Sequence, residues 1–140
     1  MKVLVDTSVW VDFFNGYPSS EARALRGLLQ SDHDLCTCGV VISEVFQGLH
    51  KPKDRAQATR LFLELGFLEA ASIDLYFRSA DLFRNLRQRG RTIRSTIDCL
   101  IAVLAEENRC ALLARDRDLD QIVESGLLSL ARWPLGSLPT

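Results

Sequence analysis

The sequence predicts an α/β protein in which helices sandwich a mainly parallel sheet. Three observations support this fold class. Short apolar runs alternate with longer segments of helical periodicity, and turn residues separate them. The short runs are continuously apolar, as in parallel strands that are covered on both faces. The chain has 140 residues, 47% of them hydrophobic and 25% charged, which is typical of one globular domain with a sizeable core.

The first half of the chain contains two predicted strands and four predicted helices. Residues 3–5 form a continuous apolar run and residues 35–37 follow a turn, so both are expected to be short strands. Apolar residues at helical spacing, preceded by capping residues and followed by Gly or Pro, predict the helices. These helices are expected to begin after Thr7 or Ser8, after Ser19 or Ser20, near residue 41, and at Asp54.

The second half continues the same alternation. Gly66 ends a helix, and residues 67–70 read as a strand. Asp74 is expected to cap a long helix that ends near Gly90. The remaining predicted elements are an apolar helix over 97–107, a strand over 111–114, a short helix over 119–123 and a last strand over 128–131.

Composition limits the class of protein. No apolar run approaches the roughly 20 residues of a membrane span, and no secretory signal opens the chain, so we expect a cytoplasmic protein without membrane contact. The four cysteines and two histidines show no zinc-ligand spacing, which favours structural thiols. The net charge of −1 does not exclude a nucleic-acid partner, because residues 84–94 carry five arginines and no acid.

Four acids stand where apolar residues surround them. Asp6 and Asp116 follow apolar strands, and ligands of parallel sheets bind at the carboxyl ends of the strands. Glu44 and Asp98 interrupt apolar helical faces. Taken singly, each acid has an ordinary interpretation, as a helix cap, as a solvent-facing residue, or as an acid in the first turn of a helix that the helix dipole stabilises.

Taken together, these acids predict a site for a hard cation. Converging carboxylates repel one another and take up protons unless a cation lies between them. Oxygen-only ligands are those that Mg²⁺ or Mn²⁺ prefers. Such a site lowers the pKa of a bound water and stabilises displacement at phosphorus. Our hypothesis from the residues is therefore metal-dependent hydrolysis of a phosphodiester.

Four stretches also carry a family resemblance. In chain order these are VLVDTSVWVDFF, VISEVFQGL, RGRTIRSTIDCLIAVLA and LLARDRDLDQI, and together they resemble PIN-domain ribonucleases, specifically the VapC-type toxins of type II toxin–antitoxin systems. The resemblance implies a Rossmann-like three-layer α/β/α sandwich, a single PIN domain over residues 1–140, and an acidic pocket that binds Mg²⁺ or Mn²⁺. It assigns the catalytic and metal-binding roles to Asp6, Glu44, Asp98 and Asp116.

The resemblance also suggests supporting residues. Ser8, with Thr7 beside it, matches the hydroxyl that in the family steadies the acidic cluster or a bound water. Asp118 and Asp120 are nearby acids that could assist or replace Asp116, which we favour because it follows the strand more closely. The family often has Thr or Ser before the last acid, where this chain has Arg115 and thus an added cation.

Partners follow from the same resemblance. It implies an RNA substrate, a cognate VapB-type antitoxin that covers the active site, and a homodimer or a larger toxin–antitoxin assembly. Arg91, Arg94 and Arg115 are the candidate RNA-binding residues. An alternative is a catalytically silent PIN-like module that only binds RNA or protein. The apolar residues Trp10, Phe13, Phe14, Phe46 and Leu49 either line the antitoxin groove or belong to the core.

Overall fold

A four-stranded parallel sheet forms the centre of the computed structural model, which describes residues 2–135. Its strands lie in the order β3-β2-β1-β4, and every pairing between them is parallel. Leu4 on β1 pairs with Cys36 on β2 and with Leu112 on β4. The strands are β1 (Lys2–Val5), β2 (Asp34–Cys38), β3 (Gly66–Leu68) and β4 (Ala111–Leu113).

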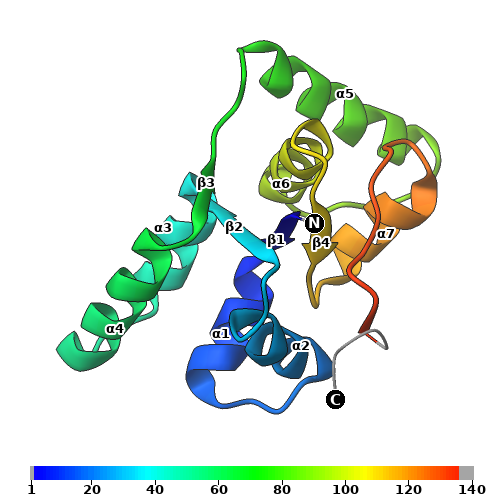
Figure 1. Cartoon of the computed structure of the whole chain (residues 1–140). Helices are drawn as coiled ribbons and strands as arrows, with labels where there is room; N and C mark the ends of the chain where they lie inside the picture. Colours follow the sequence, from blue (N-terminus) through cyan, green and yellow to red (C-terminus); the bar gives the residue numbers. More distant parts are fainter. Residues whose placement is uncertain (1, 136–140) are drawn as a thin grey trace.

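Helices cover both faces of this sheet, which confirms the predicted three-layer α/β/α sandwich. Figure 1 shows α5 and α6 on one side of the sheet and α1 and α2 on the other, with α7 beside β4. The helices are α1 (Thr7–Asn15), α2 (Ser20–Leu29), α3 (Gly39–Gln47), α4 (Pro52–Leu63), α5 (Asp74–Gln88), α6 (Thr96–Glu107) and α7 (Arg117–Ser125).

The apolar runs are continuous because the strands are covered on both faces. Val3, Leu4 and Val5 of β1 are all fully buried, so only Lys2, at the start of this central strand, is exposed to solvent. Polar side chains begin the helices that follow. Asp6 caps α1 and Asp116 caps α7, in both cases by accepting backbone N–H groups of the first turn.

Several sequence predictions are wrong. The cap of α1 is Asp6 and not Thr7 or Ser8, and α4 begins at Pro52 and not at Asp54. Residues 128–131 do not form a strand, because the returning chain makes only one isolated bridge to the sheet, between Arg132 and Leu112. Leu128 and Leu130 are apolar because they pack against the core, so burial without strand pairing produced the misleading pattern. Asp74 is not a cap but the first residue of α5, and the cap position is taken by Ile73, which makes no side-chain cap hydrogen bond.

The aromatic residues of α1 belong mainly to the core. Trp10 is fully buried and its ring lies 4.6 Å from that of Phe62, measured between centroids. Phe13 and Phe14 are partly buried and pack beside it. The core interpretation of Trp10 is therefore confirmed, and Trp10 has no exposed surface to offer to a partner.

The cysteines and the helix lengths agree with the composition. Cys36, Cys38, Cys99 and Cys110 are all free and buried, as expected of structural thiols. Among residues 2–135, no helix has the length and hydrophobicity needed to cross a membrane.

Candidate metal centre

The candidate site lies where β1 and β4 end. Asp6 directly follows β1, and its Oδ2 accepts hydrogen bonds from the backbone N–H of Ser8 at 3.1 Å and from the Ser8 hydroxyl at 2.6 Å. Asp116 follows β4, and its Oδ1 accepts the N–H groups of Asp118 at 2.8 Å and Leu119 at 3.1 Å. Each acid thus uses one oxygen as a helix cap, and capping leaves the second oxygen available.

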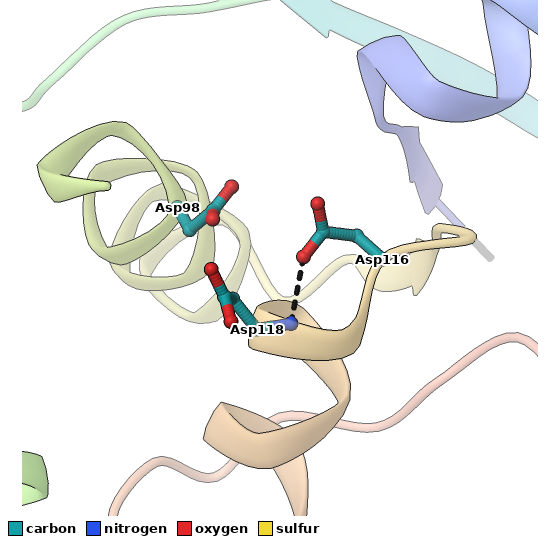
Figure 2. Close-up of side chains that lie close together, drawn as sticks. All are labelled: Asp98, Asp116 and Asp118. Atoms are coloured by element: carbon teal, nitrogen blue, oxygen red, sulfur yellow. Dashed lines mark hydrogen bonds between the residues drawn. The ribbon is translucent and has the colours of Figure 1, made fainter. Parts of the chain in front are cut away.

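Three carboxylates converge at this end of the sheet. Asp98 lies in the first turn of α6, Asp116 caps α7, and Asp118 lies in the first turn of α7. One oxygen of each of the three lies within 4.8 Å of the others. Figure 2 shows their carboxylates pointing toward a common space between the starts of α6 and α7. The structure therefore brings Asp98 to two acids that lie 18 and 20 positions later in the sequence.

The pKa of Asp98 reflects both its burial and the charges of the acids around it. Burial, followed by the charges of the neighbouring acids, raises the pKa of Asp98 from 3.8 to about 7. The contributing charges, in decreasing order, come from Asp116, Asp6, Asp118 and Glu44. All four predicted acids, together with Asp118, therefore act on one small volume.

Asp6 and Glu44 do not belong to that group of three, but they lie close enough for their charges to raise the pKa of Asp98. Asp6 is 4% exposed, and burial raises its pKa although its hydrogen bonds to Ser8 oppose that shift. Glu44 on α3 accepts a hydrogen bond from the Thr7 hydroxyl at 2.8 Å, which ties α3 to the start of α1. Thr7 and Ser8 thus each hold one of the acids in position.

The three candidate arginines lie in different places. Arg94 reaches the acidic cluster: its backbone N–H and its Nε both donate to Oδ2 of Asp118 at 3.2 Å, while its side chain is 74% exposed. Arg91 lies beside α7, 3.9 Å from a carboxylate oxygen of Glu124. Arg115 forms an ion pair with Asp12 on α1. Only Arg94 contacts the acidic cluster through an ion pair in the described part of the chain.

Sequence analysis did not single out Asp12, which is 6% exposed. Arg115 donates to it twice, from Nε to Oδ2 at 2.6 Å and from Nη2 to Oδ1 at 3.0 Å, and the Ser19 hydroxyl donates at 2.8 Å. Burial raises the pKa of Asp12, but these hydrogen bonds and the Arg115 charge outweigh it, so the pKa lies below its usual value. The signal was present, because Asp12 interrupts the apolar run VWVDFF.

Asp118 and Asp120 differ although both lie near Asp116. Asp118 is 4% exposed and belongs to the cluster, whereas Asp120 lies 3.1 Å from Arg132, an arginine outside the site. Of these two nearby acids, only Asp118 belongs to the group of converging carboxylates found among residues 2–135.

The donor set of the cluster fits a hard divalent cation. The converging groups are carboxylates, and no cysteine or histidine joins them among residues 2–135. Mg²⁺ and Mn²⁺ prefer such oxygen ligands, and a cation among them would relieve the repulsion that raises the pKa of Asp98.

The chain is similar in sequence to a known domain family and to two proteins named as ribonucleases. The PIN domain family model matches residues 3–124. VapC ribonuclease Mb1587 of Mycobacterium bovis and Ribonuclease VapC11 of Mycobacterium tuberculosis are each 31% identical over 132 residues, which is 94% of this chain and 98% of theirs.

Solved structures show the same fold at lower identity. VapBC2 from Rickettsia felis, bound to a promoter DNA fragment, gives a TM-score of 0.70 at 22% identity, covering 96% of this chain and all of that chain. VapC20 of M. tuberculosis, a sarcin-ricin loop cleaving toxin, gives 0.63 at 18% identity, covering 89% and 95%. The resemblance drawn from four motifs is confirmed, and the chain belongs to the PIN-domain family, among its VapC ribonucleases.

Proposed function

We propose that this protein is a metal-dependent endoribonuclease, the toxin of a type II toxin–antitoxin module, built as a single PIN domain over residues 1–140. The observation that carries the proposal is the convergence of Asp98, Asp116 and Asp118 within 4.8 Å, with Asp6 and Glu44 close enough to raise the pKa of Asp98. Relatives that are 31% identical over nearly their whole length are named ribonucleases, which supports RNA as the substrate.

The five acids hold the cation, which is Mg²⁺ or Mn²⁺. When bound, such a cation polarises a phosphate oxygen and makes a coordinated water more acidic. Neighbouring groups of the chain fix the orientation of these carboxylates. The Ser8 hydroxyl fixes one oxygen of Asp6, the Thr7 hydroxyl fixes Glu44, and the first turn of α7 fixes one oxygen of Asp116. Fixed ligands lose little conformational entropy when the cation and the phosphate arrive.

Arg94 is the first candidate for a phosphate contact. Its guanidinium is held beside the acidic cluster by Asp118 yet stays largely exposed, so it can reach a phosphate of bound RNA. Arg91, three residues earlier in the chain, lies beside Glu124 and not beside the acidic cluster. The guanidinium of Arg115 already forms an ion pair with Asp12. We therefore rank Arg94 above Arg91, and both above Arg115, for RNA binding.

The proposed partners follow from the relatives. Solved neighbours from R. felis and from Haemophilus influenzae are VapBC structures, which supports a VapB-type antitoxin for this chain as well. We further propose a homodimer and a cytoplasmic location, as in the initial expectation. Antitoxin binding is testable by co-purifying the chain with an antitoxin co-expressed from the same operon.

The decisive test is RNA cleavage with and without the metal. Wild-type protein in Mg²⁺ or Mn²⁺ is compared with Asp6→Asn and Asp98→Asn, which keep the size of each side chain. We expect each variant to lose about 100-fold or more in rate, because each removes a charge that the cation requires. Asp81→Asn, on the exposed surface of α5, is the matched control and keeps full activity.

The same experiment addresses the alternative of a silent binding module. Such a module binds RNA but shows no cleavage in either metal, and Asp98→Asn leaves its RNA affinity unchanged. Full cleavage by both site variants, or cleavage that persists in EDTA, would contradict the proposed mechanism.

A further inference from the structure

Arg115 ties the segment carrying Asp116 to helix α1 at two successive turns. Its backbone N–H donates to the Ser8 hydroxyl at 3.0 Å, and that hydroxyl in turn donates to Asp6. Its guanidinium forms the two parallel hydrogen bonds to Asp12, one helical turn further along α1. The start of the β4–α7 loop is thus fixed to α1 through both its backbone and its side chain.

The Asp12 side of this contact is itself held firmly. Its carboxylate is buried, and the Ser19 hydroxyl, which also caps α2, donates to it at 2.8 Å. The Arg115 guanidinium lies over the ring of Tyr17, 4.9 Å from its centroid. A two-pronged arginine–carboxylate contact with a buried acid has a defined direction, so it restricts where the neighbouring residue can lie.

We propose that the Asp12–Arg115 pair is a positioning device that holds Asp116, and through Ser8 also Asp6, at the spacing that the acidic cluster needs. In this role Asp12 and Arg115 need no contact of their own with the cation or the RNA. They act through the backbone of residue 116 and the Ser8 hydroxyl. The inference rests on the proposed metal-dependent function, and it adds to it two residues that the family assignment does not supply.

The geometry explains why this loop needs a fixed start. Asp116 has an extended backbone, with φ −148° and ψ 127°, and lies outside any strand or helix. Its carboxylate must face Asp98 on α6 while its Oδ1 caps α7. Sites on loops are placed less precisely than sites on helices or strands unless neighbouring contacts hold them. The contacts of Arg115 with Ser8 and Asp12 are therefore well placed to fix the position of Asp116, the next residue.

The first test uses the metal-free full-length protein and so does not depend on any metal. Hydrogen exchange is measured by NMR at the N–H groups of Arg115, Asp118 and Leu119, which donate to Ser8 and Asp116. Arg115→Lys keeps the charge but cannot make the two-pronged contact. We expect exchange at these three amides to quicken about fivefold or more, because local opening becomes easier.

The second test measures Mn²⁺ affinity by isothermal titration. Arg115→Lys and Asp12→Asn should each weaken Mn²⁺ binding about tenfold, the usual range for residues that orient a ligand without touching the metal. The double variant should be little weaker than either single variant, because both changes break the same contact.

Arg78→Gln is the matched control for both tests. Arg78 also pairs with a carboxylate, that of Glu106, but does so between α5 and α6, away from the acidic cluster. It should leave both the three amide exchange rates and the Mn²⁺ affinity unchanged. If Asp12→Asn does not fold, Arg115→Lys still decides the question, because its side chain lies at the surface.

Two results would overturn the inference. One is exchange at the three amides that stays within about twofold of wild type in Arg115→Lys. The other is Mn²⁺ affinity that is unchanged in Arg115→Lys while the wild-type protein binds the ion. If the wild-type protein binds no Mn²⁺, the proposed function fails instead, and the exchange comparison alone decides the role of the pair.

Discussion

Asp98 and Asp12 are two aspartates of one protein in opposite electrical surroundings. Asp98 faces other acids at the start of α6, and burial together with their charges raises its pKa to about 7. Asp12 faces Arg115 and the Ser19 hydroxyl, and these partners lower its pKa despite burial. A buried acid without a cationic partner lowers the stability of the fold, and such unpaired acids are found at binding sites. A buried acid that is paired and hydrogen-bonded, as Asp12 is, holds the structure together instead.

The largest effect on stability is expected at Asp12. Asp12→Asn removes the charge that two hydrogen bonds from Arg115 and one from Ser19 are directed at. We expect the free energy of unfolding to fall by about 2 kcal/mol, as when a buried hydrogen-bonded charge loses its complement. Urea unfolding at pH 7.5 or so measures this change, with the exposed Asp81→Asn as control. A loss no larger than that of the control would contradict the structural role of Asp12.

Asp98→Asn should act in the opposite direction. In metal-free protein near pH 8 the variant removes a charge that its neighbours repel, so the free energy of unfolding should rise by about 1 kcal/mol. This figure is well below the full electrostatic value, since the carboxylate is partly exposed and solvent screens it. Thermal unfolding in EDTA gives the measurement. A lower melting temperature in the variant would show that Asp98 is not under repulsion.

The pH dependence sharpens the same comparison. The pKa of Asp98 is raised, so the folded state holds more protons than the unfolded state between about pH 4 and pH 7. Metal-free stability should therefore decline as pH rises through that window, and Asp98→Asn should flatten the decline. The lowered pKa of Asp12 acts at lower pH: its contribution is present above its ordinary value of 3.8 and is lost as pH falls below it. Melting curves across pH 3 to 8 or so separate the two.

The smallest effect concerns Arg94, the cation nearest the cluster. Arg94→Gln should weaken RNA binding only a few-fold and reduce the slope of log affinity against log salt by about 1, as one lost phosphate contact predicts. Arg60→Gln is the control, because Arg60 is exposed on α4 and lies outside the arginine-rich segment 84–94. Equal slopes in the two variants would remove Arg94 from the RNA path.

Much of the fold could be predicted because its signals are local. Continuous apolar runs mark strands that are buried on both faces, and a capping residue marks the start of α2 at Ser19. The last strand was predicted wrongly because apolar residues at 127–130 pack on the core without pairing. Local pattern reports burial, and it cannot tell whether the buried backbone also joins a sheet.

The candidate site, too, could be predicted only in part from the sequence. Asp6 and Asp116 could be found because they follow strands, and Asp98 because it interrupts an apolar helix. The partner of Asp12 could not be found, because Arg115 lies 103 residues away and only the pairing of β4 with β1 brings them together. The sequence pattern thus identifies the acids of the candidate site. Only the tertiary fold shows that Asp12 is neutralised by an arginine of the protein itself.

The strand order has a consequence for how the protein is made. β1 is synthesised before β4 but pairs with it, and the residues of β4 follow those of β1 by more than 100 positions. The acidic cluster therefore cannot assemble until residue 118 has been synthesised. A nascent or prematurely terminated chain that stops before β4 carries Asp6 and Glu44 but lacks Asp116 and Asp118, so the acidic site cannot form until β4 and the start of α7 have been synthesised.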